Sequence, residues 1–188
     1  MCLLHSLNAL FQRKKFSNGD MDVICNQLAP DKIINPHKSI LQTGNYDANV
    51  LMMALHKEGV DVQWFDSRKA ATELTLDEAF LCPKGKYSEF MGFIVNNPKK
   101  VMMVFNRRHW LTIKRVKGVW FNFDSKNAAP VRYEKKEMLN WLVAACKNDA
   151  QIMICRKLKS KSAKQYSGQL KTASTLSATH VPSSKYGH

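Results

Sequence analysis

The chain has 188 residues and a formal net charge of +14, and 45% of its residues are hydrophobic. This length and composition fit one globular domain with a substantial core. No apolar run approaches the ~18 residues that a membrane-spanning helix needs. The apolar N-terminus also lacks the basic region and small-residue cleavage site of a signal peptide, so we expect a protein that is neither secreted nor membrane-spanning.

The N-terminal half is predicted to be mainly helical. Its helices are expected over residues 2–14, 20–28, 47–57 and 74–81. Residues 29–45 are expected to form a loop, because Pro36 and Gly44 interrupt them. Residues 60–65 alternate as a strand, and Gly59 stands at the position where a preceding helix would end.

The C-terminal half is predicted to be mainly β-structure. Its strands are expected over residues 92–96, 110–116, 119–124 and 151–155, and one helix is expected over 134–146. Asn97-Pro98 is expected to end the first of these strands, and Lys117-Gly118 to form a tight turn between the next two. Helices that come first and strands that come later indicate an α+β fold, in which N-terminal helices pack on an antiparallel sheet.

The predicted hairpin permits a test of which side chains share a face. If Lys117-Gly118 is a two-residue turn, Val116 pairs with Val119, and Asp124 then lies opposite Leu111. His109 and Asp124 become diagonal neighbours on one face, roughly 7–8 Å apart at Cα. An imidazole and a carboxylate at that spacing can form a hydrogen bond, which fixes the tautomer of the histidine and favours the imidazolium. A slip of one residue would place the two on opposite faces.

Cys2 stands at the start of the first predicted helix. A helix N-terminus and a nearby imidazolium each lower the pKa of a thiol, and the resulting thiolate can attack a carbonyl. Taken singly, Cys2 fits an inconsequential cysteine, His109 a histidine at the end of a sheet, and Asp124 an acid beside a turn. Together they fit the nucleophile, the base and the orienting acid of a cysteine hydrolase.

Six segments carry a more specific signal. They are residues 2–12, 36–39, 43–50, 92–96, 108–110 and 120–126. In order and spacing, across roughly residues 2–155, they resemble the Josephin family of papain-like cysteine deubiquitinases, and the small single-domain members are most similar. The resemblance implies a papain-like (Josephin) fold, with Cys2 as nucleophile, His109 as general base and acid, and Asp124 as the third member.

The resemblance also implies what the protein works with. Ubiquitin and ubiquitinated proteins would be its partners, and no metal or organic cofactor is implied. His5, Asn8 and Gln12 match the helix of the nucleophile, where we expect structural roles. The five cysteines, which form no C-x-x-C pair, favour reduced thiols and argue against zinc, so we expect a cytoplasmic or nuclear protein. We expect it to be a monomer.

The sequence departs from the family at its start. Family members have a His-Glu-(x)-Gln-type stretch before the cysteine, and its glutamine donates a hydrogen bond to the oxyanion. Only Met1 precedes Cys2 here, and Gln12 lies about three helical turns in the wrong direction. Loss of one oxyanion donor typically lowers the rate about 10²–10³-fold. We therefore expect an N-terminally truncated Josephin domain with impaired turnover.

The C-terminal residues 156–188 form a separate region of the predicted organisation. They contain seven Lys or Arg residues, no Asp or Glu, and many Ser and Thr residues. We expect a disordered tail after a catalytic domain over 1–155. The basic charge also permits weak contact with nucleic acid or an acidic surface.

Three functions therefore stay open from the sequence. The first is a cysteine-type deubiquitinase. The second is a catalytically inactive protein that keeps the fold and binds ubiquitin as an adaptor. The third is a basic module that contacts nucleic acid or an acidic membrane. In a variant of the first, removal of Met1 would leave the amine of Cys2 beside its own thiol as a base, bypassing His109.

Overall fold

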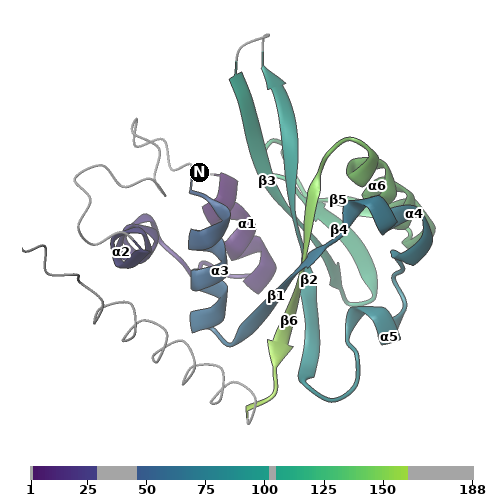
Figure 1. Ribbon diagram of the computed structural model, residues 1–188, viewed down its shortest axis with the longest axis horizontal. Coiled ribbons are helices and arrows are strands. Elements are labelled where there is room, and N and C mark those ends of the chain that lie inside the picture. The colour runs from purple at the N-terminus through teal and green to yellow at the C-terminus, as the bar shows by residue number, and fades with distance from the viewer. Residues whose placement is uncertain (1, 29–45, 102–104, 161–188) are drawn as a thin grey trace, which may run out of the picture.

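The computed structural model describes residues 2–28, 46–101 and 105–160, and it has three layers (Figure 1). In chain order the elements are α1 (Cys2–Phe11), α2 (Asn18–Leu28), α3 (Ala48–Lys57), β1 (Val60–Phe65), a 3-10 turn (Ser67–Lys69), α4 (Ala70–Glu73), α5 (Glu78–Leu81), β2 (Tyr87–Val101), β3 (Phe105–Val116), β4 (Val119–Phe123), β5 (Val131–Tyr133), α6 (Lys135–Lys147) and β6 (Gln151–Leu158). Helices α1–α3 lie on one side of the sheet and α4–α6 on the other. The loop expected over 29–45 falls outside the described residues.

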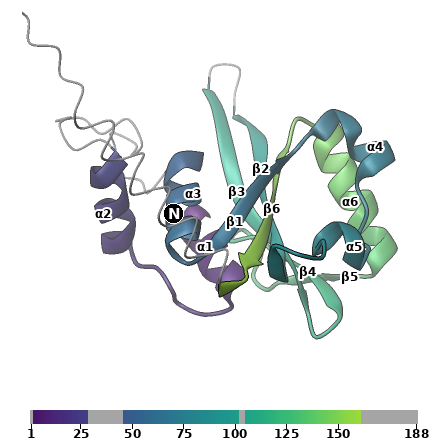
Figure 2. The same cartoon turned by 60° about the horizontal axis from the view of Figure 1, so that its bottom comes forward.

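The described strands form one six-stranded sheet in the order β1-β6-β2-β3-β4-β5, and Figure 2 shows it between the two groups of helices. Every neighbouring pair is antiparallel. The last strand, β6, lies between β1 and β2 and is therefore an interior strand of the sheet. The prediction of an α+β fold with an antiparallel sheet is confirmed.

The helix boundaries follow from local hydrogen bonds. Asp47 caps α3, because its carboxylate accepts hydrogen bonds from the backbone N–H groups of Asn49 and Val50 at 2.9 and 3.1 Å. Helix α1 ends three residues earlier than expected. The side chain of Asn8 bonds to the backbone of Lys15 and Phe16, which turns the chain back across the helix. The structural role expected of Asn8 is thereby confirmed.

The sheet separates two hydrophobic cores. On one face, Leu3, Leu7 and Leu10 of α1 are fully buried together with residues of α2 and α3. On the other face, Met138 and Leu142 of α6 are fully buried against the central strands. Alternate side chains along the central strands β2, β3 and β6 therefore serve different cores, which is the period-two pattern of a sheet covered on both sides.

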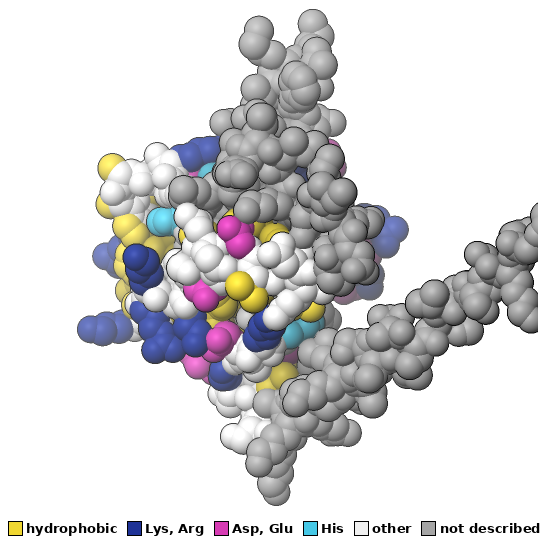
Figure 3. All heavy atoms as spheres, turned by 90° about the vertical axis from the view of Figure 1, so that its left-hand side faces the viewer, with side chains coloured by type: hydrophobic (Ala, Val, Ile, Leu, Met, Phe, Trp, Pro, Cys, Tyr) yellow, Lys and Arg dark blue, Asp and Glu magenta, His cyan; other side chains and the backbone are white. Residues whose placement is uncertain are grey.

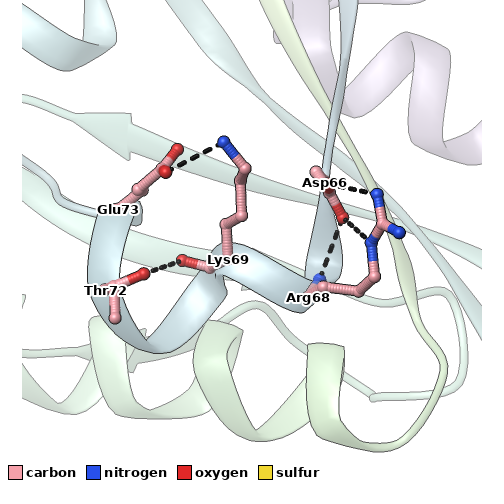
Figure 4. Close-up of polar contacts among 5 residues, drawn as sticks. All are labelled: Asp66, Arg68, Lys69, Thr72 and Glu73. Carbon is pink, nitrogen blue, oxygen red and sulfur yellow. Dashed lines mark hydrogen bonds and ion pairs between the residues drawn. The ribbon is translucent and has the colours of Figure 1, made fainter.

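The segment between β1 and β2 differs from the prediction of one helix over 74–81. Asp66 caps a helical turn instead, since it accepts hydrogen bonds from the backbone N–H of Arg68 at 3.1 Å and from the Arg68 guanidinium at 2.8 and 2.7 Å (Figure 4). Lys69 and Glu73 then form an ion pair at 3.0 Å. The signal that was missed is a capping acid, Asp66, followed by an ion pair between residues four apart on a helix. The helical segment ends at Leu74, whose backbone is extended (ψ 120°).

Strand β2 is longer than expected and contains Pro98, which was expected to end it. The reason is that β6 pairs with β2 only as far as Asn96, opposite Gln151. Beyond that point β2 has β3 as its one described neighbour, and proline is tolerated where a strand has a free side. The short strand β5, which pairs with β4, was not predicted.

Strand β6 also corrects the domain boundary expected after residue 155. It continues to Leu158, because its pairing with β1 and β2 extends to that end. The Arg156 side chain is 3% exposed, and it donates hydrogen bonds to the carbonyls of Leu81 and Phe80 at 2.7 and 2.8 Å and to Gln63 at 2.7 Å. This arginine therefore belongs to the folded domain and ties α5 to the sheet.

Helix α1 is held to β3 by buried polar bonds. The hydroxyl of Thr112 donates to the carbonyl of Ser6 at 2.7 Å, and the Ser6 hydroxyl donates to the carbonyl of Cys2 at 2.9 Å. Two residues further along β3, the Lys114 ammonium donates to the carbonyl of Leu10 at 2.9 Å. The middle and the C-terminal end of the helix are thus fixed to one strand.

Gly92 permits the close approach of α1 to the sheet. Its φ is +153°, and a Cβ at this position would lie 2.8 Å from the carbonyl oxygen of Ile113 and 2.9 Å from a methyl group of Leu10. Only a residue without a side chain fits between strand β3 and the helix at this distance.

Candidate active site

Cys2 is the first residue of α1 and is partly buried. The bond from Ser6 to its carbonyl and the packing of Leu3 and Leu7 fix its backbone against the sheet. Its side chain lines an open depression of about 580 Å³, together with His109, Ser125, Lys126 and residues of α1. A partly accessible thiol at a helix N-terminus is the environment of a reactive cysteine.

The β3–β4 hairpin brings a histidine and an acid together beside this cysteine. Lys117 and Gly118 both have positive φ (49° and 84°), and Val116 pairs with Val119. This is the two-residue turn that the sequence predicts, and the expected register is confirmed. His109 Nε2 lies 2.6 Å from the Oδ1 atom of Asp124, and both side chains are largely buried.

The end of β4 leaves one backbone group of β3 unused by the sheet. The last β3–β4 pair is Thr112 with Phe123, so β4 ends before it reaches the position opposite Trp110 of β3. The backbone N–H of Trp110 instead forms a hydrogen bond with the thiol of Cys2. This donor helps to hold negative charge on the sulfur.

The pKa shifts of the thiol and the imidazole have opposite signs. Burial acts to raise the pKa of Cys2, but the hydrogen bonds from the His109 side chain and the Trp110 N–H, with the charge of His109, outweigh it and lower the pKa below 9.0. The hydrogen bond with Cys2 raises the pKa of His109; burial opposes this, and the hydrogen bond and charge of Asp124 add to it. Both shifts favour a thiolate–imidazolium pair.

The nitrogen atoms of His109 have separate partners. Nε2 faces Asp124, so Nδ1 is the nitrogen that remains for Cys2. Asp124 also accepts a hydrogen bond from the backbone N–H of Lys126 at 2.9 Å, which fixes its carboxylate. The structure therefore brings together all three residues singled out in the sequence, in the order thiol, imidazole, carboxylate. Such a chain can generate a nucleophile and deliver a proton to a leaving group.

Gln12 lies away from the thiol. Its side-chain amide donates to the carbonyl of Ala9 at 2.5 Å, and its backbone, with φ of 53°, terminates α1. It lines a neighbouring depression that does not include Cys2. This agrees with the expectation that Gln12 has a structural role and is not a donor to an oxyanion at Cys2.

Sequence comparison agrees with this geometry. The family model of the Josephin domain matches residues 1–156. The chain belongs to the Josephin family. The matched region of this Josephin domain contains Cys2, His109 and Asp124, and the family includes deubiquitinases.

Individual relatives have the same family name. Josephin-2 of Homo sapiens is 39% identical over 135 residues, which is 69% of this chain and 66% of the relative. Josephin-2 of Mus musculus is 36% identical over 150 residues, 77% of this chain and 74% of the relative. A Josephin-like protein of Drosophila melanogaster is 37% identical over 137 residues, 69% of this chain and 57% of the relative. The matched part of this Josephin domain thus spans between about half and three quarters of these relatives.

Three further observations concern metal ions, membranes and the charged surface. In the parts of this Josephin domain that are described, no three His, Cys, Asp or Glu side chains gather in a way that could hold a metal ion. No described helix combines the length and the apolar character that crossing a membrane requires. On the side of α2 and α3, Lys and Arg side chains gather at one edge of the described surface, with Asp and Glu side chains beside them (Figure 3).

Proposed function

We propose that this Josephin domain is a cysteine-type deubiquitinase that hydrolyses the bond between the C-terminal carboxyl group of ubiquitin and an amine. The observation that carries the proposal is the continuous chain from the Cys2 thiol through His109 to Asp124, with the His109–Asp124 contact at 2.6 Å. Membership of a family that includes deubiquitinases supports ubiquitin as the substrate.

In the proposed reaction, the Cys2 thiolate attacks the carbonyl carbon of the isopeptide bond. The imidazolium of His109 gives its proton to the departing lysine amine, and the acyl group stays on the sulfur. His109, now neutral, then takes a proton from water, and the hydroxide displaces the thiolate and releases the carboxylate. Asp124 stays ionised throughout and keeps the imidazole in the required orientation.

The test is covalent labelling by ubiquitin that carries a C-terminal electrophile. We expect Cys2 to be labelled, and we expect labelling to be lost in Cys2→Ala and strongly reduced in His109→Ala. Cys82→Ala is the matched control, because Cys82 is the other partly exposed cysteine and lies outside the site. Intact mass before and after reaction identifies the labelled residue, and shows whether Met1 has been removed.

A second comparison separates the effect of an oxyanion donor on turnover from the effect of Cys2, His109 and Asp124. The chain is compared with a version that has an upstream extension containing glutamine, as family members have. Labelling of both, with faster turnover by the extended form, supports the proposal together with the expected effect of one oxyanion donor, about 10²–10³-fold. Ubiquitin binding without labelling of either form would support the adaptor alternative. Binding that is lost when residues 156–188 are removed, and that weakens with salt, would support the basic module.

A further inference from the structure

A second depression extends the site along the exposed face of α1. It has a volume of about 360 Å³ and lies between α1 and the segment 123–130 that follows β4. His5, Asn8 and Ser125 line both this depression and the one that contains Cys2. The two are therefore parts of one continuous trough, which begins at the thiol and runs past Ser125 to Arg13. We call it the α1 groove. Besides His109 and Asp124, its polar lining includes His5, Asn8, Gln12, Arg13, Ser125, Lys126 and Asn127.

The groove is adjacent to His109, the group that protonates the leaving amine in the proposed reaction. The departing amine must be within reach of the proton on His109, because this imidazolium is the general acid. The groove passes His109 and then Asp124, its partner, before it continues along α1. A chain attached through the departing lysine would enter the groove from the His109 end.

The charge of the groove is positive when the site is ready to react. Asp124 is the one acidic residue that lines either depression, and its carboxylate is already engaged by His109 and by the N–H of Lys126. Arg13 and Lys126 are exposed, and no described Asp or Glu forms an ion pair with either. Asn8, Gln12 and Ser125 add uncharged polar groups. A lining of this kind complements carboxylates and repels cations.

We propose that the α1 groove binds the polypeptide that flanks the ubiquitinated lysine and prefers acidic residues there. The inference rests on the proposed function, because it assigns the leaving-group side of that reaction. The preference for acidic residues is inferred from the positive lining of the groove.

The test measures binding, so that it does not depend on turnover. Ubiquitin is joined through an isopeptide bond to a lysine within an acidic, a neutral or a basic peptide of equal length. Each conjugate is titrated onto the full chain with Cys2→Ala. We expect the acidic conjugate to bind about two- to tenfold more tightly than the basic one, as for two exposed charge pairs. The preference should shrink as salt is added.

Two charge reversals on neighbouring residues give a matched comparison. Arg13→Glu should abolish or invert the order of the acidic and basic conjugates. Lys14→Glu, an equal charge change at an exposed residue that does not line the groove, should retain it. Free ubiquitin should bind with the same affinity to the parent chain, to Arg13→Glu and to Lys14→Glu, because in this proposal the groove does not contact ubiquitin itself.

Equal affinities for the three conjugates would overturn the proposal. So would a preference for the acidic conjugate that survives Arg13→Glu or falls equally in Lys14→Glu. Failure of the proposed function would appear elsewhere, as the absence of electrophile labelling at Cys2 in the unmodified chain. The order of the conjugates can still be measured in that case, so the two failures are distinguishable.

Discussion

Replacement of Asp124 is the sharpest test of how the site works. The carboxylate contacts His109 Nε2 at 2.6 Å, and the side chains of the acid and the histidine are 15% and 10% exposed. A hydrogen bond to a charged group contributes about 1.5–3 kcal/mol, and 1.36 kcal/mol corresponds to a tenfold change in rate. Asp124→Ala should therefore lower kcat/KM by about 10- to 150-fold. Asp124→Asn keeps an acceptor for Nε2–H without the charge, and should lower it by only about 10-fold.

The same replacement should narrow the pH profile. The reactive pair needs a thiolate and an imidazolium, so activity rises as the pH passes the pKa of Cys2 and falls as it passes that of His109. The charge of Asp124 is one of the influences that raise the pKa of His109. Without it, the alkaline limb should move to lower pH, whereas the acid limb, which is set by the Cys2 thiol while His109 is still protonated, should stay in place.

The assay is the release of a fluorescent amine from the C-terminus of ubiquitin, followed across pH for the parent chain and the two variants. Urea denaturation of each variant shows whether lower activity comes from a less stable fold or from a misoriented His109. Glu89→Ala, which removes an exposed acid near the start of β2, is the charge control. Equal activities of the Asp, Asn and Ala forms, or an alkaline limb that does not move in either variant, would show that Asp124 does not act on His109.

Three further perturbations test the parts of the fold that support the site. Thr112→Val removes the buried hydroxyl that holds α1, and should lower the free energy of unfolding in urea by about 1–3 kcal/mol; a variant as stable as the parent would contradict this. Gly92→Ala places a Cβ against a backbone carbonyl and should cost roughly 1–3 kcal/mol, whereas Gly19→Ala, with its nearest contact at 3.7 Å, should not destabilise. Iodoacetamide should modify Cys2 at pH values well below 9.0, the ordinary pKa of a thiol, and the modification rate at these pH values should fall in His109→Ala. If the rate depends on pH in the same way in the parent and in His109→Ala, the thiolate–imidazolium pair is excluded.

Local signals account for the predictions that were correct. The Lys117-Gly118 turn sets the hairpin register, because both residues adopt positive φ, and the register alone places His109 and Asp124 on one face. Asp47 and Gly59 likewise mark the ends of α3 within a few residues of sequence. Each of these features depends on residues that lie within a few positions of one another in the sequence.

The errors occurred where distant partners decide the outcome. Pro98 does not end β2, because β6, the strand that would need its missing N–H, pairs with β2 only as far as Asn96, opposite the first residue of β6, Gln151. Arg156 was expected in the tail, yet it is buried, because carbonyls of α5 accept its guanidinium.

The sequence by itself determined the helix that begins at Cys2 and the hairpin that pairs His109 with Asp124. The apolar spacing of Leu3, Leu7 and Leu10 specifies the helix, and the Lys117-Gly118 turn specifies the hairpin. Tertiary structure alone decided that these two elements meet. Their approach depends on Thr112 and Lys114 binding the carbonyls of α1, and on Gly92 leaving room for the helix. These contacts join residues about a hundred positions apart, and no periodicity or motif within either segment specifies them.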